Sequence, residues 1–208
     1  MAGKCGLGGI VLREQIAQEA ARLIIDHGMH DYGQAKRKAV QRFGIREWAA
    51  LHSNSEIESS VLERLRIFDS DLHAQRLIAM RRLAADIMEL LGDFEPRLVG
   101  SVLAGTVTEN TPLELHVFTD SPEDVFFELI TQGISSRECQ RRYRIRGRSF
   151  KIIPGLHFTR EGERVYVIIF PEKGLRQAPI SLVDRGPMER AGRRSVLSLL
   201  EQPATNAR

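Results

Sequence analysis

The sequence predicts an α+β protein, in which a helical amino-terminal region precedes a small mixed sheet. In the first ninety residues, apolar side chains recur every three or four positions, which is the period of an amphipathic helix. After Phe94-Glu95-Pro96, the pattern changes to short apolar runs separated by turn residues, which are typical of strands. With 208 residues and 42% hydrophobic side chains, the chain is long enough for one or two compact units.

Four helices are expected before the sheet. Two of them stop at Gly28 and Gly44, because glycine commonly ends a helix. Ser53-Asn54-Ser55 offers a polar cap to the third helix, with acidic residues in its first turn. The expected helices therefore cover 11–27, 32–43, a segment that follows the cap at 53–55, and 71–91.

The strands are expected at 97–103, 113–118, 143–153, 157–160 and 164–170. Ser121-Pro122 marks a helix start between the second and third strands, because serine caps a helix and proline suits its first turn. Glu161-Gly162-Glu163 predicts a hairpin turn. A short helix is expected at 194–201. We expect a helical region at 1–69, an α/β domain at 70–175, and a C-terminal loop with a short helix at 176–208.

The most informative motif is Leu98-Val99-Gly100-Ser101, followed by Glu114-Leu115-His116-Val117. Residues two apart share one face of a strand, so Glu114 and His116 are expected to point the same way. A Gly-Ser turn, followed about a dozen residues later by an alternating acidic and hydrophobic strand, resembles the active site of the nucleotidyltransferase superfamily. The resemblance covers about residues 70–170 and implies a nucleotidyltransferase-like, polymerase-beta-like fold for the mixed-sheet domain.

The resemblance also implies roles for single residues. Gly100 and Ser101 would contact a nucleoside triphosphate. Glu114 and His116 would be the catalytic residues and would hold a divalent metal, Mg²⁺ or Mn²⁺, with RNA or protein as the acceptor. The run 97–119, with basic residues at 36–38 and a Gly-Leu-Arg segment at 174–179, resembles a bacterial family of nucleotidyltransferase-like proteins.

The chain departs from the superfamily pattern in its carboxylates. His116 stands where the second acid belongs, and the run 165–170 lacks the third acid. Magnesium prefers oxygen ligands, whereas imidazole suits zinc, manganese or iron. Asp120 and Glu172 lie just beyond strand ends and are the candidates to replace the missing acids. The residues therefore leave two main hypotheses open: metal-dependent nucleotide transfer, or a noncatalytic, metal-free module that binds RNA or another polyanion. A structural, partner-binding protein is a third possibility, which would follow if the amphipathic helices left a large apolar stripe exposed.

The segment 137–151 is the most basic part of the chain, with seven cations against the single acid Glu138. Alternation along a strand is expected to place the arginines on one face and Tyr143 and Ile145 on the other. Guanidinium groups suit phosphates because they offer planar paired donors. An edge strand that uses charge against aggregation is the alternative. The predicted phosphate and polyanion ligands are Arg142, Arg144, Arg146 and Arg148.

A second basic patch, Lys36, Arg37 and Lys38, is a further candidate for polyanion binding, and a solvated helix surface is the alternative. Trp48 and three tyrosines are few aromatic residues for a stacking-based reader of single strands. From the Gly-Ser motif and the two basic segments, we expect a nucleotide and RNA as partners.

The remaining composition points to a cytoplasmic protein without a membrane partner. Only Cys5 and Cys139 are present, which argues against a disulfide framework, and no apolar run approaches the roughly 20 residues of a membrane span. No phosphate-loop or dinucleotide-binding fingerprint occurs. The net charge of +3 is mild, and the oligomeric state stays open.

Overall fold

The computed structural model describes residues 7–27, 29, 32–44, 53–68, 70–146 and 149–201. The chain divides into two compact units. The first comprises 1–73 with 108–110 and 182–184, and the second comprises 74–107, 111–181 and 185–208. The predicted stop at Gly28 lies outside the described residues, as does Cys5.

The first unit is built from three helices, α1 (Leu7–His27), α2 (Tyr32–Arg42) and α3 (Asn54–Phe68). Its core joins all three, and fully buried members include Ile16, Ala39 and Ile57. Ser53 caps α3 as predicted. Its Oγ accepts the amide of Glu56 at 3.3 Å, and Glu56 Oε2 in return accepts the amide of Ser53 at 2.7 Å.

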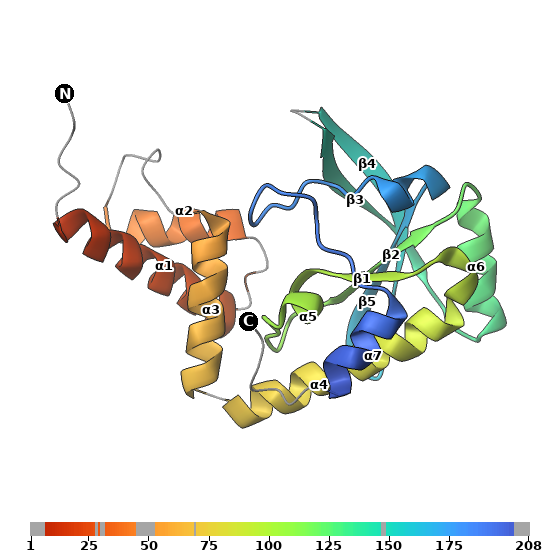
Figure 1. The fold of residues 1–208 in the computed structure, drawn as a ribbon, viewed down its shortest axis with the longest axis horizontal. Coiled ribbons are helices and arrows are strands. Elements are labelled where there is room, and N and C mark those ends of the chain that lie inside the picture. Colours follow the sequence, from red (N-terminus) through yellow and green to blue (C-terminus); the bar gives the residue numbers. More distant parts are fainter. Residues whose placement is uncertain are drawn as a thin grey trace. The chain divides into compact units, whose positions relative to one another are not determined.

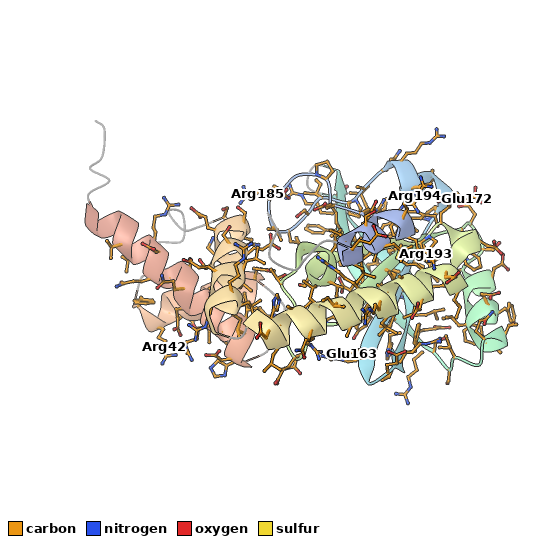
Figure 2. The ribbon with its side chains drawn as sticks, turned by 60° about the horizontal axis from the view of Figure 1, so that its bottom comes forward. Arg42, Glu163, Glu172, Arg185, Arg193 and Arg194 are labelled. Carbon is orange, nitrogen blue, oxygen red and sulfur yellow. The ribbon has the colours of Figure 1, made fainter. Side chains whose placement is uncertain are left out.

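The basic patch on α2 faces away from this core. Arg37 and Lys38 are exposed and Lys36 is half-buried, whereas Ala35 and Ala39 are buried. Arg42 at the end of α2 donates to Glu19 at 2.9 Å (Figure 2). Alternation of small apolar and basic residues therefore separates a buried and a solvated side of the helix, as the sequence indicated.

The second unit holds a five-stranded mixed sheet in the order β1-β2-β5-β4-β3. β2 and β5 run parallel, and the other neighbouring pairs are antiparallel. This arrangement confirms the predicted α+β fold class. Its strands are β1 (Arg97–Val99), β2 (Leu113–Phe118), β3 (Arg137–Arg146), β4 (Ser149–Arg160) and β5 (Glu163–Phe170). Its helices are α4 (Ser70–Leu90), η1 (Gly92–Phe94), α5 (Gly100–Ala104), α6 (Pro122–Thr131), η2 (Glu172–Arg176) and α7 (Arg193–Glu201).

One face of the sheet carries the main core of this unit. Leu115 and Val117 of β2 and Val167 of β5 pack there with side chains of α4, α6 and α7. Figure 1 shows α4 and α7 side by side, and Arg193 of α7 donates to the carbonyl of Ala85 at 3.1 Å and to Glu89 at 2.7 Å (Figure 2). The alternate residues of β2 and β5, Glu114 and His116 among them, therefore face the opposite side of the sheet.

Three predicted strands are wrong in extent. The strand expected at 97–103 ends at Val99, because Gly100 adopts φ = +70° and the chain turns there into α5. The strand expected at 143–153 spans the end of β3 and the start of the antiparallel β4, and the strand expected at 157–160 is the end of β4. The predicted cap of α6 is also absent: Ser121 makes no side-chain capping bond, and its amide donates instead to Thr119 Oγ1 at 3.0 Å. The hairpin turn at 161–163 is confirmed, with positive φ at Glu161 and Gly162.

The β3–β4 hairpin extends beyond β5 and bends over the second face of the sheet. Only residues 155–160 of β4 pair with β5, whereas 149–157 pair with β3. Tyr143 and Ile153 from the hairpin join Phe118 and Phe170 of the sheet in a separate apolar cluster. A Cβ at Gly155, where β4 leaves β5, would lie 2.7 Å from the carbonyl oxygen of Val167. The bend therefore depends on a residue without a side chain.

Among the described residues, no helix is both long enough and apolar enough to cross a membrane.

Substitution of Gly155 by alanine is expected to lower the free energy of unfolding by about 1–3 kcal/mol, because backbone atoms must move to admit the added methyl group. Gly92→Ala is the matched control, since no atom lies within 4 Å of a Cβ there. Urea unfolding of both variants measures the difference, and equal stabilities would contradict the steric role of Gly155.

Candidate functional site

The Gly-Ser turn lies directly beside Glu114. Val99, the last residue of β1, is paired with Glu114 on β2, and Gly100 follows with φ = +70°. A Cβ at Gly100 would lie 3.2 Å from Glu114 Oε2. Glycine therefore allows both the positive φ at position 100 and the short distance between this backbone and the Glu114 carboxylate. The structure thus brings Gly100 and Glu114 together, with Ser101 next to them in the first turn of α5.

Arg81 of α4 holds α5 in place. Its Nε donates to the carbonyl of Val102 at 3.2 Å, and its Nη2 donates to that of Leu103 at 3.1 Å. These carbonyls lie near the C-terminal end of a short helix, where a cation is favourable. Burial lowers the pKa of Arg81. The sequence indicates a buried role for Arg81, because this arginine falls between Met80 and Leu83 on the apolar face of its helix.

Glu114 forms an ion pair with Arg141, a residue that the sequence did not single out from the basic segment 137–151. Arg141 Nη2 lies 3.5 Å from Glu114 Oε1, and the side chains of Arg141 and Glu114 keep 40% and 30% of their surfaces exposed. Burial raises the pKa of Glu114, and the charge of Arg141 opposes this shift. The guanidinium of Arg141 also lies 4.3 Å from the centre of the Tyr166 ring. The carboxylate of Glu114 is thus paired with an arginine.

His116 is fully buried, and both of its ring nitrogens are hydrogen-bonded. Arg190 Nε donates to His116 Nδ1 at 3.1 Å, and Nε2 lies 3.0 Å from the hydroxyl of Tyr143. Arginine only donates, so Nδ1 is the acceptor and the proton is on Nε2, which donates to Tyr143. Burial, with the positive charge of Arg190, lowers the pKa of His116 to about 3. His116 is therefore neutral in a fixed tautomer.

These hydrogen bonds bear directly on the metal and catalytic roles of His116, which stay predictions. A histidine binds a metal through an unprotonated nitrogen. The lone pair of Nδ1 is taken by Arg190, and Nε2 carries the proton. The same bonds leave no basic nitrogen to accept a proton from a substrate. His116 is thus a packed and hydrogen-bonded side chain in this structure.

Arg190 links this network to the segment that follows β5. Its Nη1 donates to the carbonyl of Gly174 at 2.8 Å, and its guanidinium lies 4.9 Å and 5.0 Å from the ring centres of Phe118 and Phe170. Burial lowers the pKa of Arg190 to about 10, so the side chain stays cationic near neutral pH. Arg190 therefore presents a positive charge on the same face of β2 as Glu114.

The segment around Arg190 touches both edge strands of the sheet. The amide of Ile180 donates to the carbonyl of Arg144 on β3 at 2.7 Å. Ala191 exchanges two backbone hydrogen bonds with Leu98 on β1, at 2.8 Å and 2.9 Å. Both edges are thereby partly paired.

The other candidate acids do not reach Glu114. On β5, Tyr166 is the register partner of Glu114 and Ile168 that of His116, so no carboxylate lies there. Asp120 follows the far end of β2, where its Oδ1 accepts the amide of Glu172 at 3.3 Å (Figure 2). The strand alone separates its first and last residues by about 16 Å at roughly 3.3 Å per residue.

The structure places the predicted arginine row on the side of β3 opposite to Tyr143. Arg142 and Arg144 are the register partners of Ile152 and Phe150, whereas Arg141 and Tyr143 point to the face that holds Glu114. Arg148 and the side chain of Arg146 lie outside the described residues. Arg144 is therefore not brought to Glu114, and Arg141 takes that position instead.

No protein-family model matches the sequence, and no curated protein matches it. Among solved structures, the chain is similar to Cid1 in complex with the UTP analogue UMPNPP, with 18% identity over 51% of this chain and 36% of that chain, at a TM-score of 0.34. It is also similar to a cytoplasmic RNA terminal U-transferase, with 20% identity over 56% and 34% of the two chains and a TM-score of 0.32. A third is the Cid1 poly(U) polymerase bound to MgATP, with 21% identity, coverages of 56% and 38%, and a TM-score of 0.35. The chain spans little more than a third of the length of these proteins.

The depressed pKa of His116 predicts an acid-sensitive fold. The unfolded histidine takes up a proton near pH 6.5, whereas the folded one does so only near pH 3. The unfolded state therefore binds more protons in this window, and the free energy of unfolding should fall by about 1.4 kcal/mol per pH unit below about pH 6.5. Urea unfolding of the wild type and of His116→Gln between about pH 7 and about pH 5 measures this contribution. Identical pH dependences would contradict it.

Proposed function

We propose that the second unit is a nucleotidyltransferase-like module that binds a nucleotide through its phosphates without metal-dependent transfer. The observation that carries this proposal is the pairing at the two motif positions. Glu114 forms an ion pair with Arg141, and both ring nitrogens of His116 are hydrogen-bonded, to Arg190 and to Tyr143. The resemblance to nucleotidyltransferases implies that metal-dependent transfer would need free carboxylates at these two positions.

The donor set does not fit Mg²⁺ or Mn²⁺. These cations prefer several oxygen ligands. Glu114 supplies one carboxylate, and its register partner on β5 is Tyr166. We therefore assign no catalytic step to a metal, and the proposal departs from the metal-dependent alternative at this point.

Guanidinium groups supply the positive charge that a phosphate requires. Arg141 Nε and Arg190 Nη2 are buried and have no hydrogen-bond partner within the described part of the chain. Phosphate oxygens satisfy such donors with strong, charge-assisted hydrogen bonds. Ser101, beside Gly100 and Glu114, would contribute a hydroxyl. The site that we propose thus uses Ser101, Arg141 and Arg190 for a nucleoside triphosphate.

Calorimetric titration with ATP, CTP, GTP and UTP tests this proposal, with Mg²⁺ or with EDTA. We expect one or more nucleotides to bind with the same Kd in both conditions. Arg141→Ala should weaken binding about tenfold or more, because a charge-assisted hydrogen bond is lost. Arg82→Ala is the control, since it removes an exposed arginine from α4, which covers the other face of the sheet.

Glu114→Gln separates the two hypotheses by the sign of its effect. In our proposal the carboxylate competes with phosphate for Arg141, so the variant should bind nucleotide as tightly as the wild type or more tightly. Metal-dependent transfer to RNA or protein would instead require Mg²⁺ or Mn²⁺ and would be lost in Glu114→Gln. Such a loss, or the failure of all four nucleotides to bind, would overturn the proposal.

A further inference from the structure

The outer part of the β3–β4 hairpin has an exposed face that does not pack on the core of the second unit. Arg142 and Ile152 are register partners, as are Arg144 and Phe150, so all four side chains lie on one face of a two-stranded ribbon. We call this face, with Gln140 and Pro154 as the next pair, the ribbon face. The opposite face of the same ribbon carries Tyr143.

Large apolar side chains are exposed on the ribbon face. Phe150 keeps 49% of its surface exposed and Ile152 keeps 67%. Arg142 is exposed too, and its guanidinium lies 4.0 Å from the centre of the Phe150 ring. An aromatic ring stacked with a guanidinium is a flat, cationic surface. Protection of an edge strand explains the arginines but not the phenyl and isoleucine side chains beside them.

We infer that the ribbon face binds single-stranded nucleic acid, with a base stacked on Phe150 and the backbone phosphates held by the arginines. Charge complementarity favours this occupant, since the six residues that define the ribbon face include Arg142 and Arg144 and no acidic residue. Stacking on an aromatic side chain together with a basic surface is the general mode of single-strand binding. The inference is independent of the proposed nucleotide site, because the two use opposite faces of β3.

This inference revises the expectation drawn from the small number of tryptophan and tyrosine residues. A phenylalanine stacks as well, and composition cannot say which of the nine are exposed. Duplex nucleic acid suits the face less, because its bases are already stacked. We therefore expect single strands to bind more tightly than a duplex of the same sequence.

Fluorescence anisotropy with labelled single-stranded RNA and DNA of one sequence, and with their duplexes, tests the inference in the whole 208-residue chain. Phe150→Ala and Phe150→Leu should each weaken single-strand binding about fivefold or more, whereas Phe150→Trp should retain it. The leucine variant keeps an apolar surface and removes only the ring. Phe127→Ala is the matched control, because Phe127 is 61% exposed on α6 and should change binding by less than about twofold.

Arg142→Glu should weaken binding and flatten its dependence on salt, because one fewer phosphate is neutralised. Binding of RNA and DNA alike is expected, and binding of RNA alone would restrict the ligand to RNA. Unchanged affinity in both Phe150→Ala and Phe150→Leu would overturn the inference. So would displacement of the oligonucleotide by poly-glutamate at equal concentration, since that result would indicate an acidic protein partner.

Discussion

The buried hydrogen bonds of His116 join three segments that are distant in the sequence. Arg190 Nε donates to Nδ1, and Nε2–H donates to Tyr143, so β2, β3 and the segment after β5 meet at one imidazole ring. Because the ring is fully buried, any unsatisfied nitrogen would carry the cost of desolvation without a compensating bond. The inward position of Tyr143 and the course of the chain at Arg190 both depend on this neutral histidine.

On the same face of β2, Glu114 has an arginine beside it in place of further carboxylates. An enzyme that gathers carboxylates must gather metal cations with them, because like charges repel at short distance. Here the guanidinium of Arg141 balances the charge of Glu114. The register partner of Glu114 on β5 is Tyr166, and the same guanidinium lies over its ring. One carboxylate and one arginine are balanced without any ion. A phosphate group would enter this site by competing with Glu114 for Arg141.

Alternate side chains of β3 belong to two different surfaces, the side of the sheet that holds Glu114 and His116, and the ribbon face. Arg141 pairs with Glu114 and Tyr143 with His116, while Arg142 and Arg144 belong to the ribbon face. The bend at Gly155 allows both, because it carries the hairpin beyond β5 and over the sheet. The most basic segment of the chain therefore contributes one arginine to the candidate nucleotide site and others to a separate surface.

The sequence by itself determined the fold class, the four amino-terminal helices, the limits of β2 and the position of the Gly-Ser turn. These features follow from periodicity, helix caps and glycine, which act over a few residues. Only the tertiary structure decided that Arg141 pairs with Glu114 and that Arg190, 74 residues away in the chain, saturates His116. Alternation predicted two faces for β3 but not which of them turns toward β2. That choice is made by the register of the strands and the bend at Gly155, because side-chain burial and hydrogen bonding are satisfied only after distant segments have met.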